Sequence, residues 1–130
     1  MIVLDTCSIL WDALEKGRIT RKARHTIEHE NDSGLIFCEI SFWEIAMLMQ
    51  KQRLKVDCSY SHLINLILRS RNYILQGITP DIADRSTHLP ETVSSDPADR
   101  MIVATALCMN LKLITGDTNL IASRVVPVVW

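Results

Sequence analysis

Short, continuous apolar runs alternate along this chain with longer segments in which apolar residues recur every three or four positions. The short runs predict buried β-strands, and the longer periodic segments predict helices with one apolar face. The expected strands occupy residues 1–5, 35–38, 73–78, 111–115 and 125–129. The expected helices occupy residues 7–17, 19–32, 41–54, 60–71 and 80–89, with a longer one inside 94–109.

This alternation is typical of an α/β protein whose sheet is covered by helices on both faces. We therefore expect a three-layer α/β/α sandwich around a central, mainly parallel sheet of four or five strands. Pro127 interrupts the last apolar run and confines that strand to an edge of the sheet, because proline cannot donate a ladder hydrogen bond. No linker or repeat divides the chain, so residues 1–130 are expected to form a single domain.

Composition narrows the classes of function. The 130 residues are 48% apolar and carry a net charge of -1, so no global basic character indicates nucleic-acid binding. The four cysteines are widely separated and form no C-x-x-C pair, which argues against a disulfide framework or a zinc site. The longest uncharged apolar run, 101–109, is too short to cross a bilayer, which needs roughly 20 residues. We expect a cytoplasmic protein without membrane attachment.

The helix within 94–109 is apolar on most sides but begins with charged residues. Asp96 suits the N-cap, Pro97 the first turn and Asp99 the third position, where the helix dipole favours a carboxylate by roughly 0.3–1 kcal/mol. Residues three apart share a face, however, and two charges 4 Å apart repel by about 4 kcal/mol at an effective dielectric of about 20. Capping alone therefore does not explain the pair, and a bound cation would relieve the repulsion.

Two further acids follow predicted strands. Asp5 ends the first strand and Asp117 follows the fourth, so both fall at the carboxyl edge of the sheet, where open α/β folds bind ligands. The alternative for each is local: Asp5 caps the next helix, and Asp117 starts a turn in "GDTN".

Glu44 is the fifth acid. "SFWE" matches a capping box with Ser41 as the cap, which is one interpretation of Glu44. The other is that Glu44 points into an enclosed groove, because its helical neighbours Met47 and Leu48 are apolar.

Five acids gathered at one edge require cations or shared protons to neutralise them. A hard divalent ion, magnesium or manganese, is the simplest solution, since these ions bind carboxylates, water and phosphate oxygens. Such ions lower the pKa of a bound water and clamp the attacking and leaving oxygens of a phosphoryl displacement.

Four motifs in this order, "IVLDTCSIL", "SFWEIAML", "DPADRMIVATA" and "LITGD", resemble those of the PIN-domain ribonucleases, most closely the VapC-type toxins of bacterial toxin–antitoxin systems. The resemblance covers essentially the whole chain. It implies an α/β/α fold, Mg²⁺- or Mn²⁺-dependent cleavage of RNA by metal-activated water, a cytoplasmic homodimer, and inhibition by a cognate antitoxin of a type II module.

By position, the resemblance implies a set of site residues. The expected metal ligands are Asp5, Glu44, Asp99 and Asp117, and Asp96 is an additional catalytic acid. Asp5 and Asp99 are the expected direct ligands, with Thr6 and Thr115 as supporting hydroxyls. The chain departs from many relatives at Ala98, where an aromatic is common, and at Cys7 and near Ser94, where histidine is common. These departures bear on the subfamily and the substrate rather than on the chemistry.

Basic residues supply candidate RNA contacts. Arg18, Arg21 and Lys22 share one side of the second predicted helix, and Lys51 and Arg53 lie at the end of the third. A solvated helix face is the alternative explanation of both groups. Arg100 either steers phosphate or pairs with Asp96 or another acid.

Other functions remain open at this point. A haloacid-dehalogenase-like phosphatase would need acids where Cys7 and Ile121 stand. A receiver-like phospho-switch would need paired acids after the first strand, which the chain lacks. A non-toxin PIN-domain nuclease, or a degenerate PIN-like module that binds RNA or protein without cleaving it, is the remaining alternative.

Overall fold

The computed structural model describes all residues 1–130 and contains a five-stranded parallel sheet in the order β3-β2-β1-β4-β5. The strands are β1 (Ile2–Leu4), β2 (Leu35–Cys38), β3 (Tyr73–Gln76), β4 (Leu113–Ile114) and β5 (Val128–Val129). The helices are α1 (Thr6–Leu14), α2 (Arg21–Glu30), α3 (Ile40–Gln50), α4 (Tyr60–Ser70), α5 (Pro80–Thr87), α6 (Pro97–Met109) and α7 (Thr118–Ser123). A short 3₁₀ turn, Lys16–Arg18, links α1 to α2. The expected α/β class is thus confirmed, the sheet has five strands where four or five were expected, and β5, which starts directly after Pro127, is an edge strand.

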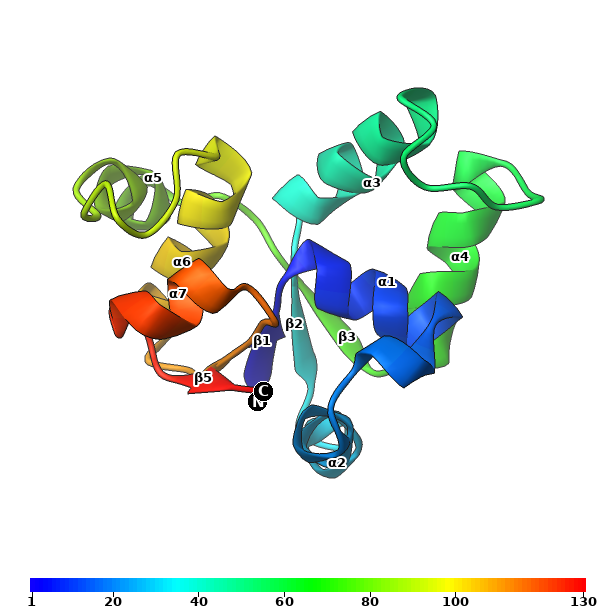
Figure 1. The fold of residues 1–130 in the computed structure, drawn as a ribbon, viewed down its shortest axis with the longest axis horizontal. Coiled ribbons are helices and arrows are strands. Elements are labelled where there is room, and N and C mark those ends of the chain that lie inside the picture. The colour runs from blue at the N-terminus through cyan, green and yellow to red at the C-terminus, as the bar shows by residue number, and fades with distance from the viewer.

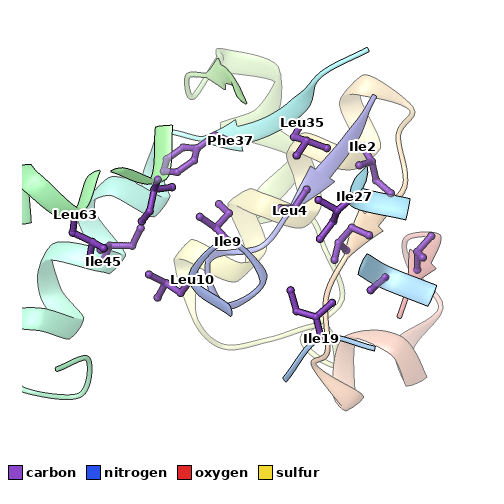
Figure 2. Packing of buried hydrophobic residues seen from close by; sticks show 14 residues of the cluster. Ile2, Leu4, Ile9, Leu10, Ile19, Ile27, Leu35, Phe37, Ile45 and Leu63 are labelled. Atoms are coloured by element: carbon purple, nitrogen blue, oxygen red, sulfur yellow. The ribbon is translucent and has the colours of Figure 1, made fainter. Parts of the chain in front are cut away.

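Two apolar clusters lie on opposite faces of the sheet and make the sandwich three-layered. Ile2 and Leu4 of β1 point into a cluster with α1, α2, α3 and α4 (Figure 2). Val3, between them, belongs to the second cluster, with α5, α6 and Leu120 of α7. Alternate residues of one buried strand therefore pack into the cores on the two faces of the sheet, which is why the strands are apolar throughout. Figure 1 shows α1 and α4 on one side of the strands and α5, α6 and α7 on the other.

Several helices are shorter than their periodicity predicts, among them α2, which spans Arg21–Glu30 where 19–32 was expected. The first ends at Leu14 instead of continuing to Gly17, because Glu15 leaves helical geometry at φ -142° and ψ 62°. The third ends at Gln50 rather than near Leu54, and Gln52 adopts a left-handed conformation at φ 57°. A further helix, α7, was not expected from the sequence. None of the helices is both long and apolar enough to span a bilayer.

Candidate metal centre

Three aspartates cap helices that begin at one end of the sheet. Asp5 caps α1, Asp96 caps α6 and Asp117 caps α7, and one oxygen of each carboxylate accepts a first-turn amide at 2.8 Å. The capping interpretation is therefore confirmed for Asp5 and Asp96, whereas Asp117, for which a turn was the alternative, caps a helix instead. Capping does not exclude a ligand role, because each carboxylate oxygen has more than one lone pair and can accept a hydrogen bond while it also binds a cation. The positive ends of the three helix dipoles also favour carboxylates at this place.

Glu44 reaches the same end of the sheet from the middle of α3. The capping-box interpretation is wrong, since α3 begins at Ile40 and Ser41 already lies inside its first turn. The Ser41 hydroxyl is buried instead and shares a 2.8 Å hydrogen bond with the Thr6 hydroxyl. Glu44 is half-buried, as its apolar neighbours indicated, and accepts a hydrogen bond from Thr6.

Carboxylate oxygens of Glu44, Asp96 and Asp99 lie within 4.8 Å of one another. We call this group the carboxylate trio. It unites α3 with the start of α6, two segments more than fifty positions apart in the chain. Asp5 and Asp117 are not members of the trio but lie close enough for their charges to act on it, since both raise the pKa of Asp99.

Each of three acids near this centre accepts a hydrogen bond from a hydroxyl. Thr6 donates to Glu44 and Thr115 donates to Asp5. Thr115 also accepts the backbone amide of Asp117 at 3.1 Å, so one buried hydroxyl links two of the acids. The two threonines therefore stand where the supporting hydroxyls were expected.

Ser94 is the third hydroxyl, and sequence reasoning did not assign it a role. It donates to Asp99 Oδ2 at 3.1 Å and accepts the backbone amide of Asp96 at 3.0 Å. A serine two positions before an aspartate N-cap is the signal that could have indicated it, because serine and threonine hydroxyls often accept the amide two residues on.

Burial and mutual repulsion work against the ionised forms of these acids. Burial, and then the charge of Asp96, raise the pKa of Asp99 to about 6. Burial raises the pKa of Glu44 to about 7, against the Thr6 hydrogen bond and with help from the charge of Asp99. Burial also raises the pKa of Asp5, although the hydrogen bonds from Thr115 and Ser8 oppose the shift. A cation between the carboxylates would reverse these directions, because it favours the charged forms.

The donors present fit a hard divalent cation. All five acids offer oxygen, and no histidine lies in the trio. A sulfur close to the acids is that of Cys7, whose thiol pKa is raised to about 11 by burial and by the charges of Asp5 and Glu44, so it is a thiol rather than a thiolate at neutral pH. Oxygen ligands without thiolate or imidazole suit Mg²⁺ or Mn²⁺ rather than zinc.

The raised pKa of Glu44 gives a prediction about stability. In the unfolded chain the pKa of Glu44 is about 4.3, whereas in the folded chain without metal its pKa is about 7. Between those values the folded state holds more protons than the unfolded state, so Glu44 lowers stability as the pH rises. With chelator present, we expect the fall in thermal midpoint from pH 5 to pH 8 to be smaller in Glu44→Gln than in the wild type. An identical fall in both proteins, measured by circular dichroism, would contradict the assignment.

The candidate RNA-binding residues separate into two places. Arg18 and Arg53 line a groove of about 210 Å³ between α1 and the end of α3. Cys7 also lines this groove and lies close enough to the acids for their charges to raise its pKa. Arg21 and Lys22 begin α2, which lies at the opposite end of the sheet, beside the chain terminus (Figure 1). Lys51 is exposed just after α3 and lines neither place.

Arg100 does not pair with an acid. No ion pair of the structure includes it, so the expected pairing with Asp96 or another carboxylate is wrong. Its guanidinium donates to backbone carbonyls of the segment before α6 instead.

A tryptophan packs against the turn that carries Thr115 and Asp117. A Cβ added to Gly116 would lie 2.6 Å from the Trp130 ring, so only glycine allows this close approach. Trp130 also contacts Trp11, with ring centroids 5.8 Å apart, and Arg18 covers Trp11 with its Cζ 4.5 Å from the ring centroid. This aromatic support of the site was not expected, because nothing in the sequence pairs position 130 with position 116.

Comparison with known proteins assigns the family. The profile of the PIN domain matches residues 2–125. Ribonuclease VapC22 of Mycobacterium tuberculosis is 30% identical over 123 residues, which is 95% of this chain and 92% of that protein.

Solved structures share the fold. A toxin–antitoxin complex from Klebsiella pneumoniae superposes with a TM-score of 0.64 at 23% identity, covering 95% of this chain and 92% of that one. FitAB bound to a DNA fragment gives 0.63 at 19% identity, with 98% and 93% covered. FitAcB from Neisseria gonorrhoeae gives 0.61 at 19% identity, with 98% and 96% covered. With these matches and four acid-bearing motifs in one place, the chain belongs to the PIN-domain family, among relatives of the VapC-type ribonucleases.

Proposed function

We propose that this protein is a Mg²⁺- or Mn²⁺-dependent endoribonuclease that acts as the toxin of a type II toxin–antitoxin module. The observation that carries the proposal is the carboxylate trio, in which Glu44, Asp96 and Asp99 place oxygens within 4.8 Å of one another. The 30% identity to a protein named as a ribonuclease supports the reaction class.

The acids and hydroxyls of the site would have different roles. Glu44, Asp96 and Asp99 would hold the cation, and Asp5 and Asp117 would add negative charge and ligand oxygens beside it. When bound, such an ion supplies charge stabilisation to a phosphoryl displacement and lowers the pKa of water. Thr6 keeps its proton directed at Glu44, and Thr115 keeps its proton directed at Asp5, so both carboxylates are held in one orientation. Fixed orientation matters because preorganised charges need no rearrangement during the reaction.

The groove beside the acids supports a path for RNA. Arg18 and Arg53 would contact substrate phosphates there, since the groove that they line adjoins the centre. Lys51 is kept among the candidate RNA contacts only because its side chain is exposed. Arg21 and Lys22 would contact RNA only if the substrate extended to the far end of the sheet, so Arg18 and Arg53 are the favoured pair.

The same proposal includes the partners. Three structural neighbours are described as toxin–antitoxin or FitAB-type complexes, which supports a cognate antitoxin for this chain. A homodimer is supported by large apolar side chains left open to solvent, since Trp43 is 57% exposed, and Leu75 on the edge strand β3 is 46% exposed. We place the protein in the cytoplasm, in line with its unpaired cysteines.

Metal removal tests the proposal. Purified protein with a labelled single-stranded RNA is expected to cleave internally in Mg²⁺ or Mn²⁺, to stop in excess EDTA, and to resume when Mn²⁺ exceeds the chelator. The products are resolved on a denaturing gel, and Asp99→Asn purified in parallel controls for contaminating ribonuclease. Cleavage that survives EDTA, or that is equal in both preparations, would falsify a metal-dependent mechanism at these acids.

A further inference from the structure

We propose that Arg100 is a positioning residue for the metal centre, holding the segment before α6 so that Ser94 orients Asp99 and Asp96. The segment is residues 88–96, between the end of α5 and the start of α6, and we call it the α5–α6 loop. This inference rests on the proposed function, because it concerns how the carboxylate trio is kept in place.

The guanidinium of Arg100 is enclosed by main-chain carbonyls. Its Nε donates to Ser86 at 3.0 Å, and Nη2 donates to Leu89 at 2.6 Å. Its Nη1 donates to Pro90 and to Ser94, both at 3.1 Å. All three nitrogens are thus used, and the four acceptors come from the end of α5 and from both halves of the α5–α6 loop.

These contacts explain how an irregular segment holds one conformation. The loop contains no helix or strand, and its only hydrogen bond between main-chain groups of its own residues joins the Val93 amide to the Pro90 carbonyl at 3.1 Å. Without Arg100, the carbonyls that it binds would need water or new partners. A charged donor makes stronger hydrogen bonds than a neutral one. A single guanidinium can therefore hold a loop that lacks the regular main-chain hydrogen bonds of a helix or sheet.

Ser94 connects the loop to the metal centre. Its carbonyl accepts from Arg100, while its hydroxyl donates to Asp99 and accepts the amide of Asp96. Arg100 therefore fixes the main chain of the same residue whose side chain touches two members of the trio. Asp99 and Arg100 are adjacent in α6, so one turn of helix carries both the acid and the group that orients its partner.

The geometry requires arginine rather than positive charge alone. Lysine has one nitrogen and cannot donate along three separate directions from a planar group. Arg100 also contacts no carboxylate in the structure, so its effect on the acids passes through the α5–α6 loop rather than through an ion pair. Removing a group that hydrogen-bonds to a metal ligand and so fixes its orientation typically weakens metal binding by about 10- to 100-fold.

A double-mutant cycle tests this inference, with Mn²⁺ affinity measured by calorimetry on Arg100→Lys, Ser94→Ala and the double variant. Each single variant is expected to bind Mn²⁺ at least about 10-fold more weakly. The double variant is expected to bind no more weakly than Arg100→Lys, because both changes interrupt one connection. Arg85→Lys, at an exposed position of α5 whose side chain makes no hydrogen bond, is the matched control and should bind as the wild type does.

The outcomes are distinguishable. Wild-type affinity in Arg100→Lys or in Ser94→Ala overturns the inference, and so does a double variant whose loss is the product of the two single losses. Ser94→Ala keeps the carbonyl that Arg100 binds, so wild-type affinity in this variant overturns the inference even if Arg100→Lys fails to fold. If the wild type itself shows no Mn²⁺ binding that Asp99→Asn removes, the metal centre is wrong and the positioning role falls with it.

Discussion

Asp99→Asn is expected to lower the rate of RNA cleavage by at least about 100-fold while raising the stability of the metal-free protein. The activity should fall because removing even one preorganised hydrogen-bond donor from a reaction centre typically costs about 100- to 1,000-fold, and Asp99 is an expected metal ligand. The stability should rise because burial and the charge of Asp96 hold the Asp99 pKa at about 6, so ionising Asp99 at pH 8 works against folding. Asparagine keeps the shape of the side chain and an oxygen that can accept the Ser94 hydroxyl.

The opposite signs make the experiment decisive. Cleavage rates at saturating Mn²⁺ and thermal midpoints in EDTA at pH 8 are measured on the same preparations. Asp32→Asn is the control, since Asp32 is exposed in the turn before β2, at the other end of the sheet, and should change neither quantity appreciably. Loss of activity together with a lower midpoint would mean that Asp99 supports the fold, and the assignment to the metal centre would then be wrong.

The positions of the acids were predictable because strand ends and helix starts leave strong local signals. Asp5 follows an unbroken apolar run, and Asp96 precedes a proline that suits the first turn of a helix. Parallel strands end at one edge, so acids that follow them are brought together by topology alone. The order β3-β2-β1-β4-β5 places β1 and β4 side by side and so brings Asp5 and Asp117 to adjacent positions.

The grouping of the acids depended on side-chain geometry that no pattern encodes. Asp96 joins Glu44 and Asp99 in the trio, whereas Asp5 and Asp117 were expected beside Asp99 as ligands. The ligand roles remain predictions for all five. Periodicity could show that Glu44 faces inward, but not which carboxylates it meets, because that distance depends on how α3 crosses the start of α6.

The parts of the fold and site that sequence reasoning missed are short or irregular. Helix α7 has six residues and buries only Leu120, too little for a periodic pattern to stand out from the turn residues of "GDTN". The partners of Arg100 are backbone carbonyls, which every residue possesses, so no residue type indicates them. Trp130 meets Gly116 across two strand ends, a contact that only the folded chain defines.

One ion pair that lies away from the acids carries the largest expected effect on stability. Asp12 of α1 is 2% exposed and accepts two hydrogen bonds of 2.9 Å from Arg71, which follows α4 and is 15% exposed. The pair joins α1 to the residue between α4 and β3, and α1 begins at Thr6, directly after Asp5. We expect Asp12→Ala to lower the free energy of unfolding by about 3–5 kcal/mol, because the Arg71 guanidinium, only 15% exposed, then has no counter-charge.

Urea unfolding followed by circular dichroism measures the loss, and the neighbouring pair provides the control. Glu15 lies three residues further along the chain and pairs with Arg18 at 3.7 Å, but both side chains are more than half exposed. Glu15→Ala should therefore cost less than about 1 kcal/mol, since solvent screens exposed pairs. Replacing both partners, as in Asp12→Leu with Arg71→Met, should recover most of the loss, because no charge is then left unpaired. If the double replacement is as unstable as Asp12→Ala, the cost comes from lost packing around α1 rather than from an uncompensated charge.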